Sequence, residues 1–402
     1  MVNTGDTAFM LVATSLVMLM TPGLAFFYGG LVGRKNVLTI MMQSFVSMGV
    51  TTILWITVGY SMVFSGDVWG IIGNLNHAFL IGVNPSSLLS SSNHIPLFVF
   101  ISYQMMFAII TPALITGAFA NRVRFKAYML FLTLWLLLVY FPVAHMIWGG
   151  GFLQRWGVLD FAGGIVVHAT AGVAALASVL FVGRRKVKDK GPHSIPLVAL
   201  GTALLWFGWY GFNAGSELQA NGITSLAFLN TDIAASFAAI TWLVLSGMFE
   251  KKPKILGMLT GAVAGLATIT PAAGFVSIQS AMFIGILASI ASYAVVAWKN
   301  RAGLDDALDV FGVHGVGGIL GVTLLGLLGE RSVNSAGTNG LFFGNAAFFG
   351  KEMAAVAGAS LYAFAFTFFM LWLINKITPV RVSEEEEEMG LDEAEHGEQA
   401  YL

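Results

Sequence analysis

Charged residues and cysteine are what this sequence has least of. Only 10% of its 402 residues are charged, whereas soluble domains carry roughly a quarter. Cysteine is absent, which excludes disulfides, thiolate metal sites and cysteine nucleophiles. No lysine or arginine precedes the first apolar run, so the basic start of a secretory signal is missing and the first apolar segment is expected to stay in the mature protein.

Apolar residues dominate what is present. They make up 57% of the chain, and a helix needs about 20 of them to cross a hydrocarbon core of roughly 30 Å. Charge-free stretches of that length recur, so we expect an all-α polytopic membrane protein with eleven transmembrane helices in residues 1–375 and a tail in residues 376–402. The expected spans are Thr7 to Gly29, Val37 to Phe64, Pro96 to Ala120, Ala127 to Ile147, Phe161 to Val182, Pro196 to Ala214, Thr231 to Phe249, Ile255 to Phe275, Ile278 to Trp298, Leu304 to Leu327 and Met353 to Asn375.

The basic residues lie in alternate loops between these spans. All of the 20 lysines and arginines except Arg155, Arg331 and Lys351 fall on one side of the expected topology. Lysine and arginine are in excess in cytoplasmic loops. The pattern therefore predicts an N-terminus outside and a C-terminus inside the cell.

Short sequence matches recur at a distance of five spans. The segment Ile110-Thr111-Pro112-Ala113 returns as Ile269-Thr270-Pro271-Ala272, and Val167-His168 returns as Val313-His314. Because five is an odd number, the second copy must lie upside down in the membrane. We therefore expect an inverted five-helix repeat plus a final helix, with a substrate path near the midplane at the interface of the repeats.

Two histidines stand out because ionisable groups inside spans are costly and usually functional. His168 and His314 fall near the middle of equivalent spans in the two repeats. Facing each other as neutral rings, they can share one proton and form a polar strip in an apolar tube. Two alternatives are open, namely two separately satisfied core histidines and a metal site, although a catalytic zinc site generally takes three protein ligands and no third ligand accompanies this pair.

Asp160 and Trp148 both fall at the outer mouth of the fifth span. A carboxylate at a helix N-terminus can cap it, and its charge can also raise the local preference for a cation. An indole face attracts cations, but tryptophan also serves as an anchor at the membrane interface. The structural role is expected for Asp160, with a cation site as the further possibility for both.

Several segments together resemble the ammonium transporters of the Amt/MEP/Rh group, and the resemblance covers nearly the whole chain. The matching segments are Pro22-Gly23-Leu24-Ala25-Phe26-Phe27-Tyr28-Gly29-Gly30, Gln104-Met105 with Phe107, Asp160-Phe161-Ala162-Gly163-Gly164 leading to His168, Gly211-Phe212-Asn213-Ala214-Gly215-Ser216, Asp309-Val310-Phe311-Gly312-Val313-His314-Gly315 and a tail motif around Gly390. The paired histidines and the Gly-Leu-Asp tail are similar to the Amt branch rather than the Rh branch.

This resemblance implies a homotrimer in the plasma membrane, surrounded by lipid, with one pore per subunit and no cofactor, metal or nucleic acid. It assigns an outer ammonium-recruitment site to Phe107, Trp148 and Ser216. Phe107 and Phe212 are the expected gate, and His168 and His314 are the expected pore pair, so these six residues define the path.

One position departs from the family pattern. Tyr103 stands where some relatives have phenylalanine, and from this we expect a slightly more polar lining of the outer vestibule.

The chemistry of the substrate suggests how such a pore selects. Ammonium and potassium ions are similar in size, but only ammonium can give up a proton. A bare ion in an apolar tube costs many kcal/mol, whereas neutral ammonia does not. We expect deprotonation near the gate, passage of ammonia along the histidines, and a proton that follows separately or stays behind. The alternative is an ammonium sensor with little flux; an enzyme is not expected, because no nucleophile or metal set is present.

The tail differs from the rest of the chain. Nine of the 21 acidic residues lie in residues 376–402, five of them in Glu384 to Glu388, and such a run usually stays solvated. We expect it to pair with basic cytoplasmic loops, notably Arg184 to Lys190, against a neighbouring subunit. The resemblance implies that the tail couples the three pores and that a trimeric nitrogen-signal protein of the PII family plugs the exit. The segments expected to dock are Gly390-Leu391-Asp392, His396-Gly397-Glu398 and Tyr401.

Overall fold

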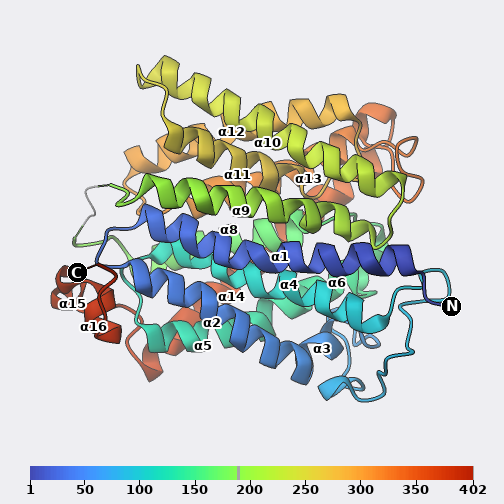
Figure 1. The fold of residues 1–402 in the computed structure, drawn as a ribbon, viewed down its shortest axis with the longest axis horizontal. Coiled ribbons are helices and arrows are strands. Elements are labelled where there is room, and N and C mark those ends of the chain that lie inside the picture. The colour runs from blue at the N-terminus through green and yellow to red at the C-terminus, as the bar shows by residue number, and fades with distance from the viewer. Residues whose placement is uncertain (188–190, 402) are drawn as a thin grey trace.

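The computed structural model describes residues 1–187 and 191–401, and helices make up nearly all of their secondary structure. The long helices run side by side along one axis of the molecule (Figure 1). The N-terminus lies at one end of this bundle, and the C-terminus, with two short helices beside it, lies at the other (Figure 1). The two ends of the chain are therefore separated by the full length of the long helices.

The α-helices are α1 Thr4–Leu31, α2 Val37–Leu54, α3 Tyr60–Phe64, α4 Leu97–Ile115, α5 Phe125–Trp135, α6 Phe141–Trp148, α7 Phe152–Trp156, α8 Thr170–Val182, α9 Ile195–Ala214, α10 Gly222–Phe249, α11 Ile255–Ile269, α12 Ile278–Ala302, α13 Val316–Leu328, α14 Ala346–Ile377, α15 Glu384–Met389 and α16 Leu391–His396. Wider π-helical turns are η1 Trp55–Gly59, η4 Leu136–Tyr140, η5 Gly164–Ala169 and η7 Phe311–Gly315, and 3-10 turns are η2 Ala78–Leu80, η3 Thr116–Phe119, η6 Gly215–Glu217 and η8 Leu341–Phe343.

Ten helical segments of the described chain are long and apolar enough to cross a membrane. The segment expected as the eighth span, Ile255 to Phe275, is helical only as α11, which ends at Ile269 after 15 residues. At 1.5 Å per residue this helix is about 22 Å long, and residues 270–275 continue it as turns. The protein is thus a multi-pass membrane protein with ten full-length helices and a shorter apolar one among the described residues.

Three helix boundaries differ from the predicted ones, and each lies close to charged residues. The seventh span begins at Gly222 rather than Thr231, after a capping box on Asn221. Asp232 lies inside it because the Tyr210 hydroxyl and the Trp206 indole donate hydrogen bonds to its carboxylate, at 2.7 and 3.2 Å. The last span likewise begins at Ala346, and the tenth begins at Phe311 rather than Leu304.

Glycine lets the helices of the two expected repeats touch at their centres. A Cβ atom at Gly172 of α8 would overlap the backbone nitrogen of Gly315, and one at Gly318 of α13 would overlap that of Ala169. Small residues allow membrane helices to approach this closely. The two segments that carry His168 and His314 are therefore held backbone to backbone.

Candidate functional site

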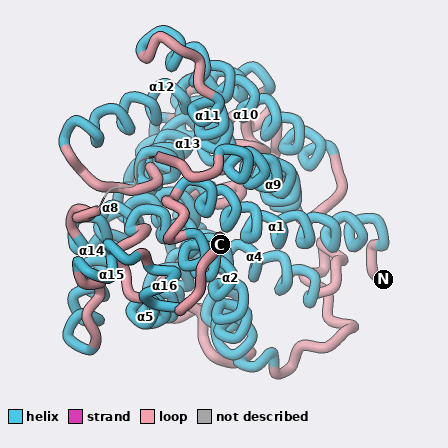
Figure 2. Tube along the Cα trace, turned by 60° about the vertical axis from the view of Figure 1, so that its left-hand side comes forward, coloured by secondary structure: helices cyan, strands magenta, loops and turns pink. Residues whose placement is uncertain are grey.

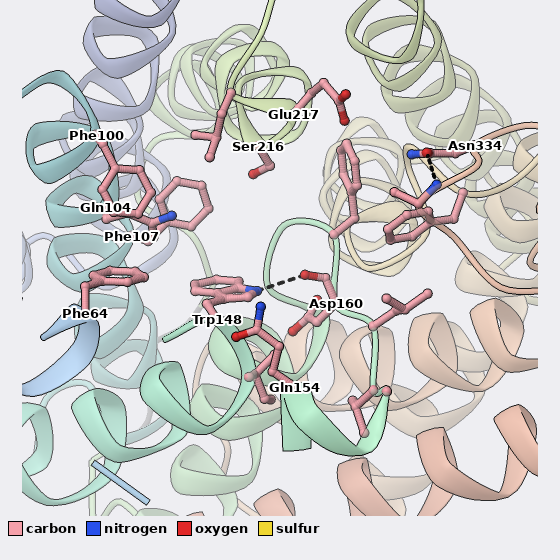
Figure 3. A pocket seen from close by; sticks show the side chains of 18 residues that line it. Phe64, Phe100, Gln104, Phe107, Trp148, Gln154, Asp160, Ser216, Glu217 and Asn334 are labelled. Carbon is pink, nitrogen blue, oxygen red and sulfur yellow. Dashed lines mark hydrogen bonds between the residues drawn. The ribbon is translucent and has the colours of Figure 1, made fainter. Parts of the chain in front are cut away.

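A cavity of about 340 Å³ opens at the end of the bundle that holds the N-terminus. Trp148, Phe107 and Ser216 line it, as expected for the outer site, and Figure 3 shows their side chains around one space. The further lining residues are Phe64, Phe100, Gln104, Ile147, Gln154, Gly157, Val158, Leu159, Asp160, Phe161, Glu217, Leu218, Phe275, Asn334 and Ala336. Aromatic faces and a few polar groups thus meet in one vestibule.

Two phenyl rings close the floor of this vestibule. Phe107 and Phe212 are stacked with ring centroids 4.2 Å apart and planes 28° apart, and each is 1% exposed. The edge of Phe107 also meets Trp148, at 5.9 Å between centroids. Phe107 comes from α4, Phe212 from α9 and Trp148 from α6, so three helices meet at a narrow aromatic barrier.

The Trp148 ring is held in place by the loop that carries Asp160. Its indole N–H donates to the main-chain oxygen of Asp160 at 2.9 Å, drawn as a dashed line in Figure 3. With this hydrogen bond in place, the indole ring lines the cavity. The orientation of the aromatic wall therefore depends on the Asp160 loop.

Asp160 itself caps the π-helical turn η5. One carboxylate oxygen accepts from the backbone N–H groups of Gly163 and Gly164, at 2.9 and 2.6 Å, and the other accepts from those of Ile165 and Val166, at 2.8 and 3.1 Å. The first helical N–H groups have no partner within their own helix, and here one side chain satisfies four of them. The carboxylate is thereby fixed at the head of the segment that carries His168.

Sequence reasoning missed the counterpart of Asp160. Asp306 accepts from the backbone N–H groups of Val310 and Phe311, at 3.0 and 2.8 Å, at the head of η7. Burial and the nearby Asp309 raise the pKa of Asp306 to about 6, although Lys299 opposes the shift. Asp306 precedes His314 by the same eight residues that separate Asp160 from His168, and this spacing was the signal that could have revealed it.

His168 and His314 lie against each other in the centre of the molecule. Their Nδ1 atoms are 3.3 Å apart, and their rings stack with centroids 5.3 Å apart. A hydrogen bond between two ring nitrogens needs one donor and one acceptor, so the two rings hold opposite tautomers. Their side chains are nearly inaccessible, at 1% and 4% exposure.

The space around the pair is narrow and apolar. A cavity of about 10 Å³ is lined by both histidines and by Phe212, Met20, Leu24, Phe27, Ile110, Leu114, Val167, Leu205, Trp209 and Val263, and such a volume suits roughly one water-sized molecule. The Nε2 atom of His168 is buried there without a hydrogen-bond partner. A small hydrogen-bonding molecule in this cavity would therefore find one free ring nitrogen.

A third cavity continues from the pair toward the other end of the bundle. It measures about 230 Å³ and shares His314, Phe27 and Val263 with the central cavity, and Asp309 and Arg185 line its far side. Outer vestibule, histidine cavity and inner cavity thus lie in series. The stacked rings lie between the first and the second, because Phe107 lines the vestibule and Phe212 lines the histidine cavity.

Tyr103 does not make the vestibule more polar, and that expectation was wrong. It is fully buried and is not among the lining residues of the vestibule. Its hydroxyl lies 2.8 Å from the main-chain oxygens of Gly211 and Phe212 and 3.3 Å from the Ser216 hydroxyl. The added oxygen supports the end of α9 behind the site.

His145 is a third buried histidine, and sequence reasoning overlooked it. Nδ1 of its ring lies 2.7 Å from the main-chain oxygen of Val63, and Nε2 lies 3.0 Å from the carboxylate of Asp67. Arg155 also pairs with Asp67, at 3.0 Å, and hydrogen bonds from both residues lower the pKa of Asp67. The cluster fastens the outer end of α6 one turn before Trp148, and its partners are too far apart in sequence to be paired by inspection.

Metal ligands do not gather around the central pair. Within residues 1–187 and 191–401, no group of three histidine, cysteine, aspartate or glutamate side chains is arranged to hold a metal ion. The geometry instead fits two histidines that satisfy each other.

The acidic tail is folded against its own chain. Asp392 caps α2, accepting from the backbone N–H groups of Leu38 and Thr39, at 3.0 and 2.8 Å, and from the Thr39 hydroxyl at 2.9 Å. Gly390 has a φ of +100° and packs so tightly on Lys35 that a Cβ atom would overlap it. Both views of the molecule show α16 beside α2 (Figures 1 and 2). The Gly-Leu-Asp segment is therefore docked on the start of α2 and on Lys35.

The acidic run is not a free spacer, because residues 384–389 form α15. Glu386 pairs with Arg124 at 2.6 Å, and Glu387 accepts from the backbone N–H groups of Lys186 and Val187, at 2.6 and 3.0 Å. Pairing with the basic loop thus occurs within this chain, and the expected pairing against a neighbouring subunit stays a prediction. Lys188 and Lys190 lie outside the described residues. The other tail residues also have partners. His396 packs on Phe125, and Gly397 ends α16 in a left-handed conformation. The Glu398 N–H donates to the main-chain oxygen of Asp392, and the Tyr401 hydroxyl lies 2.9 Å from Nε2 of His193.

Comparison with known proteins places these features in context. The family model described as Ammonium Transporter Family matches residues 8–401. The "Ammonium transporter" of Bacillus subtilis (strain 168) is 46% identical over 99% of this chain and 98% of its own length, and "Ammonium transporter 1" of Dictyostelium discoideum is 46% identical over 99% and 87%. Among solved structures, Saccharomyces cerevisiae Mep2 aligns with a TM-score of 0.89 at 33% identity, covering 96% of this chain and 88% of that one, and a structure titled "Sensor Amt Protein" aligns at 0.88 and 27%, covering 98% of each.

Proposed function

This chain belongs to the ammonium transporter family, and from that premise we propose that it takes up ammonium in the outer cavity, removes a proton and conducts ammonia past the histidine pair. Phe107, Trp148 and Ser216 form the recruitment site in this proposal. The single observation that carries it is the free Nε2 atom of His168 in an apolar cavity. Such a cavity accepts a small neutral base and excludes a bare ion.

Selection against potassium follows from the same geometry. A cation at the aromatic wall gains about 0.5 to 2 kcal/mol from the ring faces, and the Ser216 hydroxyl replaces part of its hydration shell. Beyond the stack of Phe107 and Phe212, the described residues that line the central cavity include no aspartate, glutamate, lysine or arginine. Potassium has no neutral form with which to continue, whereas ammonium can leave its proton behind at the gate or send it by a separate route.

The larger assembly is part of the proposal. We propose eleven crossings, with α11 as a short eighth one, so that the two termini lie on opposite sides of the membrane. The excess of lysine and arginine in the loops on the side of the C-terminus supports a cytoplasmic C-terminus and an N-terminus outside. The relatives are named as transporters, which fits a membrane protein without enzymatic activity. We propose a homotrimer in the plasma membrane with a pore in each subunit, an inverted five-helix repeat, and residues 376–402 as a regulatory tail beyond the helical domain.

Purified protein in liposomes gives the direct test of transport. An ammonium pulse should produce a current or an internal pH change that scales with the amount of protein, and an equal potassium pulse should produce neither. Empty liposomes control for the passive leak of ammonia. A response no larger than that leak would rule out the transport proposal.

A sensor with little flux is the second candidate function, because one similar structure is titled "Sensor Amt Protein". The same liposomes separate the two, since a sensor binds ammonium without passing it. Saturable binding of ammonium without flux would favour the sensor.

The tail is proposed to hold the pore competent, and a PII-family protein is proposed to block the exit when nitrogen is plentiful. Asp392→Ala removes the acceptor of three hydrogen bonds at the start of α2, and losing such a cap costs about 0.5 to 2 kcal/mol. We expect faster proteolytic release of the tail and flux lowered roughly in proportion to the undocked fraction, with trimers intact by size-exclusion chromatography.

Glu393→Ala is the matched control for that variant, because Glu393 lies on the same helix and is exposed. Its carboxylate accepts a hydrogen bond from the side-chain amide of the neighbouring Gln399 rather than from α2. Wild-type proteolysis and flux are expected for the control. If Asp392→Ala also behaves as wild type, docking of the tail has no part in transport.

A further inference from the structure

The outer vestibule carries negative charge that comes from only two of its lining residues. Asp160 and Glu217 are the charged side chains that line it, and both are acids. The remaining polar lining side chains, Gln104, Gln154, Ser216 and Asn334, are neutral. Figure 3 shows Glu217 beside Ser216 at the edge of the cavity, on the wall that faces Trp148.

These two acids differ in how far their charge is already compensated. Four backbone N–H groups point at the two oxygens of Asp160, which leaves little of its charge for a ligand. Glu217 receives one hydrogen bond, from the side-chain amide of Asn221 to Oε1 at 2.8 Å. Within the described residues no lysine, arginine or histidine forms an ion pair with it, so its charge is open to the cavity.

We propose that Glu217 sets the affinity of the outer cavity for cations by concentrating ammonium in front of Trp148 and Phe107. This role rests on the proposed function, because it assumes that ammonium enters through this cavity. The aromatic walls have a low dielectric, and a charged group within such a cleft focuses its field and raises the local concentration of the opposite charge. The attraction depends on charge alone. It therefore draws ammonium and potassium alike and leaves selection between them to the gate and the histidines.

Glu217→Gln tests the charge while keeping the shape. The amide oxygen of glutamine can still accept from Asn221, so the turn after α9 is retained. Ammonium binding is read from the fluorescence of Trp148 in detergent, and flux is read in liposomes, each as a function of ammonium concentration. At low salt the half-saturating concentration should rise roughly threefold to tenfold in both measurements, and the plateau flux should change less.

Salt separates an electrostatic role from a structural one. The Debye length falls from about 10 Å at 0.1 M salt to about 3 Å at 1 M salt. When the concentration of a salt of a bulky organic cation is raised over that range, the half-saturating ammonium concentrations of Glu217→Gln and wild type should come to differ by less than about twofold. The ratio of ammonium to potassium flux should stay that of the wild type. A shift that persists at high salt would overturn the proposal, and so would the absence of a shift at low salt.

A second substitution returns the charge from another wall of the cavity. Gln154 lines the same space and its Oε1 accepts from the backbone N–H of Gly150 at 2.7 Å, a bond that glutamate can also make. Gln154→Glu in the Glu217→Gln background should recover at least half of the lost affinity. No recovery would show that the position of Glu217, rather than its charge, matters.

Glu250→Gln is the matched control, because it makes the same change after the far end of α10, where Glu250 pairs with Lys254. No shift of half-saturation is expected there. The binding measurement also keeps the two proposals apart. Wild type that binds ammonium without flux contradicts transport, whereas a difference in half-saturation between Glu217→Gln and wild type that persists at high salt contradicts the role of this carboxylate.

Discussion

Replacing His168 by leucine is expected to lower ammonium flux about tenfold to a hundredfold while the protein still folds. In the wild type a molecule in the central cavity can bond to the free Nε2 atom of His168. Leucine removes that partner, and an unmet hydrogen bond in an apolar site costs about 1 to 3 kcal/mol. Such a cost slows a rate by about fivefold to 150-fold, and the expected loss lies within this range. The measurement is flux in liposomes, normalised to the amount of trimer.

The pair also makes a prediction about how two substitutions combine. Within the described residues, each ring is the hydrogen-bond partner of the other's Nδ1 atom, and the effects of substitutions at residues that act as a unit are not additive. The double variant with leucine at both His168 and His314 should therefore lose little more flux than the single variant. Multiplied losses would show two independent histidines instead. His94→Leu, at an exposed histidine in the long loop before α4, is the control and should transport as wild type.

Asp160→Ala is expected to have the largest effect on stability. It leaves four backbone N–H groups at the head of η5 without their acceptor, and each buried unpaired donor costs about 1 to 3 kcal/mol. The apparent unfolding midpoint in detergent should fall by roughly 5 to 15 °C. Because Trp148 is hydrogen-bonded to the same residue, any protein that survives should also bind ammonium more weakly.

Asp306→Ala is expected to lower the unfolding midpoint less than Asp160→Ala does, because Asp306 caps the other histidine segment with fewer hydrogen bonds. Asp306 accepts two backbone N–H groups instead of four, so its loss should lower the midpoint by about half as much. Because its pKa is raised to about 6 by burial, the folded protein binds its proton more readily than the unfolded chain. Its contribution to stability therefore falls as pH rises from about 4 to about 6. An equal or larger effect than Asp160→Ala would refute the capping account.

Much of the helical layout could be predicted because crossing a membrane imposes a length and excludes charge. That rule placed the long helices and singled out His168 and His314. It failed where a charge inside a helix is compensated from elsewhere. Asp232 and Glu352 lie within α10 and α14 because Tyr210 and the Leu159 N–H, respectively, provide their hydrogen bonds, and no local pattern announces such partners.

The residues of the candidate site could also be predicted in part from the sequence. Residue type and resemblance named the aromatic wall and the histidines, but not how they are supported. Tyr103 turned its hydroxyl toward the backbone of α9 rather than the cavity, and Asp392 reached the start of α2 from more than 350 residues away. Both depend on tertiary contacts that a single sequence does not contain.

The hydrogen bond between the two histidines has a direction, because one Nδ1 atom donates and the other accepts. The passage of a proton would reverse that direction. Suppose that a proton binds the free Nε2 atom of the first ring. The proton shared between the two Nδ1 atoms then moves to the second ring, and the second ring releases the proton on its own Nε2 atom. Both rings have then exchanged tautomers, and the entry ring now presents an N–H where it had a lone pair. A second proton cannot follow until both rings are reset, whereas a passing ammonia molecule alters neither. In the proposed function, this difference lets the pair pass ammonia repeatedly and limits proton transfer to one proton for each reset of the two rings.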